Sequence, residues 1–594
     1  MKIKVNRNFL WAEIFVKQLE ILGVKHACIS PGSRNTPLIL AFSSSKKIKN
    51  YFIIDERSSA FFALGLAKRT QTPVAVVCTS GTAAVELHPA IVEAYQQRVP
   101  LIICTADRPP ELQNVGANQA INQNDLYHNH IRWFCNPGLP QLSPGKLVAI
   151  RNIAINAFKI SAFINRGPVH INFPFRKPFE KNSFTDNFDN NFYPEFQSKE
   201  VVLKRNSINH NEKFNQSVSW NEILKSVIKA PRGLLIAGPE SFNEQNKFTL
   251  IKLSTTLGYP IFADALSGLR FGNIDAKNLI TNYDALLRSE NFLINFNPEL
   301  ILHFGRTVTS KALEIFFEKT DAVKYLINEF GDCFDPAKKT KSVFAVNPGT
   351  FCRKLLKVIR KNSLNRIDKC WIENIQDADM VAGLLKNKII SNSNFPNECK
   401  VSEVVLNCIG SNSSIMLSNS MPIRDFDYFT SISSSNLNIF FNRGASGIDG
   451  ITSTALGIAS ADKNPVILIT GDLAFYYDLN SLLLSVQNKI PLIVILVNNS
   501  GGGIFEVLPI ANYRNVFEKY FRSKHNLNFR KIVSSFQCRH TTIKSWKHLE
   551  AEIKKALKIR QLTVLELKTD AKLSLKLRNK YWVNVDKHFA IHQK

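Results

Sequence analysis

Short runs of consecutive apolar residues recur along this chain, and helical patterns separate them. The first block contains the runs PVAVVCTS (73–80), PLIICTAD (100–107) and GPVHINFP (167–174). Strands that are apolar on both faces are typical of parallel sheets that helices cover on both sides. The pattern therefore predicts an α/β protein whose parallel sheets are flanked by helices.

The same pattern returns in two further blocks, after a polar segment from about Lys181 to Gln216 that we interpret as a linker. Because 594 residues are too many for one hydrophobic core, we predict three α/β domains, at residues 1–182, 215–360 and 395–594. The later strand runs are GLLIAGP (233–239), YPIFADA (259–265), PELILHFG (298–305), SSIMLSNS (413–420), PVILITGD (465–472), PLIVILVNN (491–499) and LTVLELK (562–568).

The formal net charge of +27 at pH 7 has two interpretations. A basic surface is one mark of a nucleic-acid-binding protein. The other interpretation is a bias toward lysine that spreads charge over solvated surfaces. The basic residues do not gather into one tract and no nucleic-acid motif accompanies them, so we favour the second interpretation and expect no nucleic-acid partner.

The chain carries no sequence signal for membrane insertion or secretion. No stretch reaches the roughly 18 uninterrupted apolar residues of a membrane span. Glu13, Lys17 and Glu20 interrupt the apolar part of the N-terminal segment, which fits an amphipathic helix better than a signal peptide. Ten cysteines without CxxC pairs fit neither a zinc site nor a disulfide framework. We therefore expect a protein of the reducing cytoplasm.

Polar side chains end two consecutive strand runs of the third block. Gly471 and Asp472 end one run, and Asn498 and Asn499 end the next. Ligands of open α/β sheets bind at the carboxyl ends of the strands, which brings Asp472 and Asn499 to one edge. Carboxylate and amide oxygens suit Mg²⁺ or Ca²⁺, and the glycines at 501–503 let the backbone approach and supply a carbonyl ligand. The alternative is a set of ordinary turn residues.

A glutamate in the first block strengthens the interpretation of this spacing. The GD…NN spacing resembles the diphosphate anchor of thiamine-diphosphate enzymes. Glu56 follows the run YFIID and precedes a helix rich in small residues, a place where such enzymes have a glutamate that bonds the N1′ atom of the aminopyrimidine. On its own, Glu56 is better explained as an acidic residue favoured at a helix N-terminus.

Motifs along the first and third blocks point to one family. They closely resemble, in the same order, those of the MenD family of thiamine-diphosphate-dependent synthases, while the middle block resembles that family only weakly. The motifs are ISPGSRNTPL (29–38), TSGTAAVELHPA (79–90), TADRPPEL (105–112), GANQAI (116–121), HINFPF (170–175), SNSMPIRD (418–425), NRGASGIDG (442–450), GDLAFYYDLN (471–480) and NNSGGGIF (498–505).

The resemblance implies a reaction and a cofactor. This family decarboxylates 2-oxoglutarate on thiamine diphosphate held by Mg²⁺, for which Mn²⁺ can substitute. It then adds the four-carbon carbanion to isochorismate in a 1,4 fashion, on the route to menaquinone or phylloquinone. The three blocks become a pyrimidine-binding, a central and a diphosphate-binding domain. The cofactor lies between subunits, so the resemblance implies a homodimer or homotetramer.

The resemblance also implies site residues, at positions that match the family's motifs. For Arg34, Arg108, Arg424, Arg443 and Lys311 the alternative is a surface ion pair, and for Ile448 it is plain core packing. The implied catalytic residues are Glu56, Arg34, Arg108, Asn118, Gln119, Arg424 and Arg443. The implied substrate contacts are Ser420 and Arg424 for the succinyl part, Arg34, Arg108, Asn118, Gln119 and Lys311 for isochorismate, and Ser33 and Arg443. The implied cofactor contacts are Glu56, Ser420, Ile448, Gly471, Asp472, Asn499, Gly501, Ile504 and Phe505, with Asp472, Asn499 and Gly501 on the metal.

The sequence departs from the family pattern at a few positions. Ala312 stands where some members have a second basic residue, Glu86 and His88 where relatives often have Asn and an aromatic residue, and Ser500 where others have Asn or Asp. We expect these changes to alter affinity without changing the reaction.

Two rival functions remain open at this point. Another thiamine-diphosphate carboligase or decarboxylase, such as an acetolactate synthase, lacks this arginine set and would turn over pyruvate alone. No adjacent His-His pair is present, which disfavours a plain 2-oxo-acid decarboxylase. A non-catalytic, nucleic-acid-binding descendant would tolerate loss of Glu56 and Asp472, yet both are retained; it would bind DNA or RNA with strong salt dependence.

Overall fold

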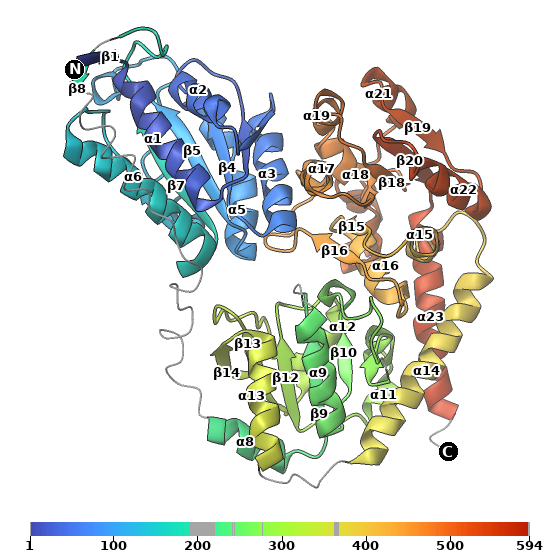
Figure 1. Ribbon diagram of the computed structural model, residues 1–594. Helices are drawn as coiled ribbons and strands as arrows, with labels where there is room; N and C mark the ends of the chain where they lie inside the picture. Colours follow the sequence, from blue (N-terminus) through green and yellow to red (C-terminus); the bar gives the residue numbers. More distant parts are fainter. Residues whose placement is uncertain are drawn as a thin grey trace.

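Three parallel sheets of six strands each form the framework of the chain (Figure 1). The computed structural model describes residues 2–184, 186–189, 220–239, 242, 244–275, 277–361 and 368–591. Each sheet is flanked by helices, as the runs of doubly apolar strands predicted. The predicted α/β class is therefore confirmed, and the strand runs named from the sequence all contain strands.

The first sheet has the strand order β3-β2-β4-β5-β7-β6. Its central strands β4, β5 and β7 are wholly buried, and β4 consists of Val, Ala and Cys alone. The strands are β2 (His26–Ile29), β3 (Lys49–Phe52), β4 (Val74–Cys78), β5 (Leu101–Asp107), β6 (Trp133–Cys135) and β7 (Pro168–Pro174). The helices are α1 (Arg7–Leu22), α2 (Thr36–Ser44), α3 (Glu56–Thr70), α4 (Thr82–Glu86), α5 (His88–Gln97) and α6 (Pro144–Lys159).

The middle sheet has the order β11-β10-β9-β12-β13-β14, the doubly wound order of dinucleotide-binding folds. Its strands are β9 (Gly233–Ala237), β10 (Ile261–Ala263), β11 (Leu279–Ile280), β12 (Leu300–Phe304), β13 (Val323–Asn328) and β14 (Thr340–Ala345). Its helices are α8 (Trp220–Lys229), α9 (Glu244–Leu257), α10 (Tyr283–Leu287), α11 (Glu290–Leu293), α12 (Lys311–Lys319), α13 (Pro348–Lys361) and α14 (Lys369–Ser391).

The third sheet, β16-β15-β17-β18-β20-β19, repeats the topology of the first. In both sheets the order is 2-1-3-4-6-5 when the strands are numbered within the sheet. The strands are β15 (Ser414–Leu417), β16 (Asn438–Phe441), β17 (Val466–Gly471), β18 (Ile493–Asn498), β19 (Arg539–Thr542) and β20 (Thr563–Lys568). The main helices are α15 (Val401–Cys408), α16 (Met421–Phe429), α17 (Ile451–Ala461), α18 (Asp472–Tyr477), α19 (Ser481–Asn488), α21 (Phe529–Ser535), α22 (Trp546–Ala556) and α23 (Ala571–Ile591).

Helices α3 and α17 join the first and third domains, and each follows the second strand of its sheet (Figure 1). They cross closely because each has a glycine at the crossing. A methyl group on Gly65 would collide with the carbonyl of Thr454, and one on Gly457 with the carbonyl of Phe62. The small residues noted after Glu56 in the sequence therefore serve this helix contact.

The C-terminal helix α23 returns to the middle domain, where it packs against α14 and α11 (Figure 1). Tyr581 and Val585 are buried in a hydrophobic cluster with middle-domain residues such as Phe296 and Trp371. The last helix of the chain thus ties the middle domain to the third.

One part of the predicted linker is structured, which corrects that prediction. Residues 186–189 form strand β8, which pairs antiparallel with β1 (Lys2–Val5) beside the first domain. Backbone pairing with β1 and the ion pair between Arg7 and Asp186 hold this short polar segment in place. Most of the remaining predicted linker lies outside the described residues.

One helical segment, Pro144–Ile164, is long and apolar enough to cross a membrane. It packs against α1, and Leu147, Ile150 and Ala154 are buried in the core of the first domain. One face of the segment therefore belongs to the core of the first domain. All ten cysteines are free thiols, as the absence of paired spacing predicted.

Candidate active site

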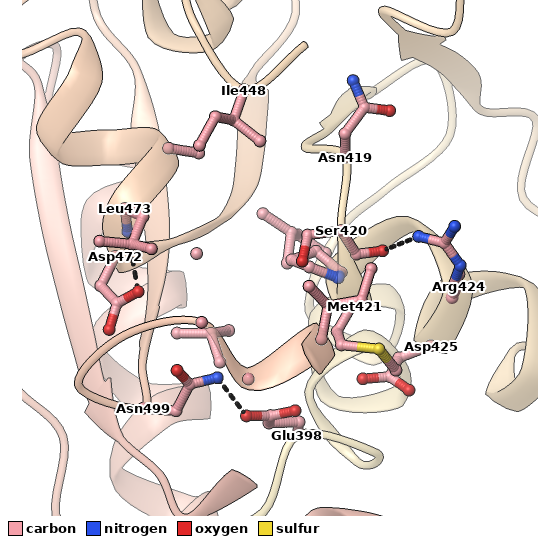
Figure 2. A pocket seen from close by; sticks show the side chains of 18 of the residues that line it. Glu398, Asn419, Ser420, Met421, Arg424, Asp425, Ile448, Asp472, Leu473 and Asn499 are labelled. Atoms are coloured by element: carbon pink, nitrogen blue, oxygen red, sulfur yellow. Dashed lines mark hydrogen bonds between the residues drawn. The ribbon is translucent and has the colours of Figure 1, made fainter. Parts of the chain in front are cut away.

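A cavity of about 340 Å³ opens at the carboxyl ends of three strands of the third sheet (Figure 2). Ser420 follows β15, Asp472 follows β17, and Asn499 follows β18. Figure 2 shows Asp472 and Asn499 on one side of this space and Ser420 and Arg424 on the other. The structure thus brings together the strand-end residues that the sequence predicted to share one edge.

Asp472 and Asn499 present oxygen atoms toward this cavity. The Asp472 carboxylate is buried; its Oδ1 accepts from the Leu473 N–H at 2.8 Å and its Oδ2 from the Gly501 N–H at 3.0 Å. Burial raises the pKa of this carboxyl group. The Asn499 Nδ2 donates to Glu398 at 2.8 Å, while its Oδ1 is buried without a hydrogen-bond partner among the described residues.

The loop after Asn499 requires glycine. Gly501 has φ +130°, and a Cβ there would collide with the carbonyl oxygen of Arg522. The Gly502 N–H donates to that carbonyl at 2.7 Å, and the Arg522 guanidinium donates back to the Asn499 carbonyl at 2.8 Å. His525 Nε2 lies 3.2 Å from Asp472 Oδ2. Arg522 and His525 escaped the sequence analysis, since they lie beyond the glycine motif.

These residues fit a divalent cation with a diphosphate. A buried amide oxygen without a partner, next to a buried carboxylate, is a costly arrangement that a cation relieves. Magnesium takes few protein ligands and completes its shell with phosphate oxygens and water. No cluster of three or more His, Cys, Asp or Glu side chains forms a different metal site in the described part of the chain.

Cationic and apolar side chains form the rest of the cavity wall. Arg424, on the first turn of α16, donates to the Ser420 carbonyl at 2.6 Å. Ser420 has φ +74°, a strained conformation of a kind that clusters at functional sites. Burial lowers the pKa of the Arg443 guanidinium, and the nearby Arg424 lowers it further. The predicted residues that line this one cavity are Ser420, Arg424, Arg443, Ile448, Gly471, Asp472, Asn499, Gly501, Ile504 and Phe505.

Two buried ionisable side chains of the first domain hold the loop that carries Arg443. Lys68 on α3 donates to the Phe441 carbonyl and, at 2.6 Å, to Asn442 Oδ1. Glu93 on α5 accepts from the backbone N–H groups of Gly444 at 2.8 Å and Ala445 at 2.6 Å. Neither role could be predicted, because nothing in the sequence distinguishes a buried Lys or Glu from an exposed one on an amphipathic helix.

Helix α16 is anchored on its far side as well. The fully buried Arg270 of the middle domain donates to Asp427 Oδ1 at 2.7 Å and to the Asp427 carbonyl at 2.6 Å. Asp427 also accepts from the Tyr283 hydroxyl at 2.8 Å. The middle domain therefore fixes the helix that presents Arg424.

A second polar cluster lies in the first domain and does not line this cavity. Arg34 donates to the Phe175 carbonyl at 2.8 Å, and Arg108 donates to Ser80 and, at 3.4 Å, to Gln119 Oε1. Burial lowers the pKa of the Arg34 guanidinium, and the charge of Arg108 adds to the effect. Ser33 and Asn118, which precede Arg34 and Gln119 in the chain, are exposed.

Glu56 lies at the start of α3, in a separate cavity of about 420 Å³. Glu86, Asn480 and Phe536 line the same space. Burial raises the pKa of Glu56, and Asp55 and Glu86 raise it further. Glu86 is one of the positions at which the sequence departs from the family pattern. This departure therefore lies in the same cavity as Glu56. Within one chain, Glu56 and Asp472 line different cavities.

Lys311 and Ala312 of the middle domain do not line the cavity. Lys311 begins α12, is 63% exposed, and pairs with Glu314 at 2.9 Å. Ala312 is buried in the middle-domain core, where a basic side chain would be costly. Of these two adjacent residues, only Lys311 has an exposed side chain.

The fold and the cavity agree with comparisons to known proteins. Three family models match: the N-terminal TPP binding domain of thiamine pyrophosphate enzymes at residues 11–126, the middle domain at 202–406, and the C-terminal TPP binding domain at 432–567. The middle block, whose motifs resemble the family only weakly, thus matches the model of the middle domain as well.

Curated relatives cover nearly the whole chain. The 2-succinyl-5-enolpyruvyl-6-hydroxy-3-cyclohexene-1-carboxylate synthase of Trichodesmium erythraeum is 36% identical, over 96% of this chain and 97% of the relative. The enzyme of the same name from Geobacillus kaustophilus is 35% identical, over 98% of both chains. That from Haloquadratum walsbyi is 36% identical, over 88% of this chain and 89% of the relative. With its strand-end Asp472 and Asn499 facing Arg424 and Arg443, the chain belongs to the 2-succinyl-5-enolpyruvyl-6-hydroxy-3-cyclohexene-1-carboxylate synthase (MenD) family of thiamine-diphosphate enzymes.

Proposed function

We propose that this protein decarboxylates 2-oxoglutarate and adds the four-carbon fragment to isochorismate, giving 2-succinyl-5-enolpyruvyl-6-hydroxy-3-cyclohexene-1-carboxylate. One observation carries the proposal: Asp472 and the unpartnered Asn499 Oδ1 share a cavity with Arg424 and Arg443. Such a cavity suits a cation-bound diphosphate together with a carboxylate substrate. The relatives over nearly the full length are synthases of this name.

The cofactor side of the site consists of Asp472, Asn499 and the Gly501 carbonyl. These groups would hold Mg²⁺, or Mn²⁺ in its place, against the diphosphate of thiamine diphosphate. The bound thiamine diphosphate supplies the electron sink for loss of CO₂. Ile448, Ile504 and Phe505 provide an apolar wall beside it, which excludes water and disfavours a charged carboxylate.

Arginines of two domains would bind the anionic substrates. A guanidinium binds a carboxylate through two parallel hydrogen bonds, which fixes its orientation. We assign Arg424 and Ser420 to the distal carboxylate of 2-oxoglutarate, with Arg443 beside them. The residues assigned to isochorismate are Ser33, Arg34, Arg108, Asn118, Gln119 and Lys311.

The active site would be completed by a second subunit, in a homodimer or homotetramer. Glu56 and Asp472 line different cavities within one chain. Phe52 and Ile54, just before Glu56, are 51% and 50% exposed, and Tyr476 and Tyr477 on α18, just after Asp472, are each 50% exposed. Large apolar side chains next to both half-sites are what a subunit interface covers. Glu56 of one subunit would then reach the cofactor held by Asp472 of another.

A turnover assay with the purified protein tests this function. Thiamine diphosphate, Mg²⁺, 2-oxoglutarate and isochorismate are supplied, and CO₂ release and isochorismate consumption are followed together. Equal consumption of both substrates is expected, with loss of activity in Glu56→Gln and Asp472→Ala. Turnover of pyruvate alone would instead favour an acetolactate-synthase-like carboligase, and CO₂ release without isochorismate consumption would contradict the proposed acceptor. We place this reaction in the cytoplasm, on the route to menaquinone or phylloquinone.

A further inference from the structure

Glu398 is a buried carboxylate at the floor of the cavity, and no motif of the sequence analysis includes it (Figure 2). It precedes α15 and is only 4% exposed. Its Oε1 accepts from Asn499 Nδ2 at 2.8 Å and from the Thr569 hydroxyl at 3.2 Å. Its Oε2 accepts from Arg578 at 2.7 Å. Every strong contact of this side chain is thus one in which the carboxylate accepts.

The contact with Asn499 decides which way the amide faces. The oxygen and nitrogen of an asparagine side chain have nearly the same size, so its orientation follows from the hydrogen bonds that each atom makes. The Oε1 atom of Glu398 accepts from the Nδ2 of Asn499, which is the donor end of the amide. The Oδ1 is then left on the other side, where it is buried without a partner among the described residues.

Arg578 holds Glu398 in place. This residue of α23 is almost fully buried, and its guanidinium also donates to both oxygens of Asp425, at 2.7 Å and 2.5 Å. The two carboxylates keep the pKa of Arg578 well above its ordinary value. Asp425 lies next to Arg424 on α16. One guanidinium therefore links the Asn499 wall of the cavity with the helix that carries Arg424.

We propose that Glu398 is a positioning residue that fixes the amide of Asn499 with its Oδ1 toward the divalent cation, and that Arg578 holds Glu398 in place. The proposal deepens the proposed function and rests on it. Groups that orient metal ligands change metal affinity by about 10- to 100-fold when they are removed. Glu398 would act through the Asn499 amide and not as a ligand of the cation.

Manganese affinity provides a direct test that needs no substrate. Mn²⁺ is titrated into the full-length protein with saturating thiamine diphosphate, and free Mn²⁺ is measured by electron paramagnetic resonance. We expect Glu398→Ala to weaken Mn²⁺ binding by about 10- to 100-fold. We expect Glu398→Gln to weaken it as well, because glutamine has one acceptor oxygen for two donors, Asn499 Nδ2 and the Arg578 guanidinium.

Thr569→Val is the matched control. It removes a hydrogen bond to the same oxygen of Glu398 and leaves the Asn499 contact intact. Its Mn²⁺ affinity should equal that of the wild type. Wild-type Mn²⁺ affinity in folded Glu398→Ala would overturn the proposal. Absence of Mn²⁺ binding by the wild-type protein would instead contradict the proposed function.

Exchanging the carboxylate and the amide between positions 398 and 499 provides a second test if Glu398→Ala does not fold. Asn499→Asp alone sets two carboxylates against each other and should weaken Mn²⁺ binding by about tenfold or more. Combining it with Glu398→Gln restores a donor facing an acceptor, and Mn²⁺ affinity should recover. A merely structural role of Glu398 predicts no recovery, so a double variant that binds no better than Asn499→Asp overturns the proposal.

Discussion

Lys68 Nζ lies 2.6 Å from Asn442 Oδ1, so a buried side chain of the first domain holds the residue that precedes Arg443 in the third. Burial lowers the pKa of Lys68 to about 7, and the charge of Glu93 opposes that effect. Glu93 holds the residues on the other side of Arg443 through two backbone N–H groups. The position of Arg443 therefore depends on contacts between domains.

Glu93→Gln should impair turnover more than folding. A glutamine offers one acceptor and one donor, so its amide nitrogen would face one of the two backbone N–H groups. Leaving such a buried group unpaired costs about 1–3 kcal/mol, which would lower kcat/KM for 2-oxoglutarate by about 5- to 150-fold if the loop shifts to relieve it. Steady-state kinetics with circular dichroism of the same samples provides the measurement.

Arg69→Ala is the control for this variant. Arg69 neighbours Lys68 on α3 and also bonds the third domain, at Asp462, 2.8 Å away, but it does not touch the Arg443 loop. Its kcat/KM should remain close to that of the wild type. Equal losses in both variants would mean that any contact between these domains matters, and that Glu93 has no particular effect on Arg443.

Mixing two inactive variants should restore activity. In a dimer formed from Glu56→Gln and Asp472→Ala chains, one of the two sites combines an intact Glu56 with an intact Asp472. Random exchange makes half of the dimers mixed, so roughly a quarter of wild-type activity should return. The measurement is turnover after co-refolding or co-expression of the two variants. No recovery in verified mixed dimers would mean that both residues of a site come from one chain.

The strands and the cavity could be predicted from the sequence because their signals are local. Apolar runs ending in Gly471-Asp472 and Asn498-Asn499 specify both the strand and the edge at which its polar residues emerge. Parallel topology then brings the two edges together without further information. The strand β8 was missed because four residues in a polar segment carry no such periodic signal.

The supporting residues could not be predicted in this way. Lys68, Glu93 and Glu398 are charged residues whose burial depends on contacts with segments more than 100 positions away in the sequence. A single sequence carries no signal for such contacts. Likewise, the small residues of α3 were noted, but only the packing of Gly65 against α17 gives them a purpose.

Alanine at either glycine of the α3–α17 crossing should destabilise the protein. A new methyl group at Gly65 or Gly457 would meet backbone carbonyl oxygen, which cannot rotate away as a side chain does. Overpacking of this kind costs about 1–3 kcal/mol. We expect a lower melting temperature in calorimetry for Gly65→Ala and Gly457→Ala, and weaker activity because the crossing also orients Glu56 and Lys68.

Gly383→Ala separates this effect from that of helix propensity. Gly383 lies within α14, and its nearest neighbour for an added methyl group is the side-chain amide of Asn282 at 3.4 Å. Alanine in a helix interior is favoured over glycine by about 0.5–1 kcal/mol, so this variant should be as stable as the wild type or more so. A comparable destabilisation of all three variants would contradict the argument from the crossing.

Acid should destabilise the middle domain through His303. Burial, together with the charge of Lys324, lowers the pKa of His303 from an ordinary value of 6.5 to about 3. Below pH 6.5 the unfolded chain binds a proton that the folded chain does not, so stability is full above that pH and falls as the pH approaches 3. The loss amounts to about 1.4 kcal/mol per pH unit within this window.

His303→Gln should reduce this acid sensitivity, since glutamine can still bond the Arg306 carbonyl that His303 Nε2 contacts at 3.0 Å. Calorimetry at pH 6.5 and 4.5 should show a smaller fall in melting temperature for the variant than for the wild type. His128→Gln is the control, because His128 is 76% exposed and its substitution should leave the fall unchanged. Equal falls in the wild type and His303→Gln would mean that His303 contributes nothing to the acid sensitivity and would contradict the prediction.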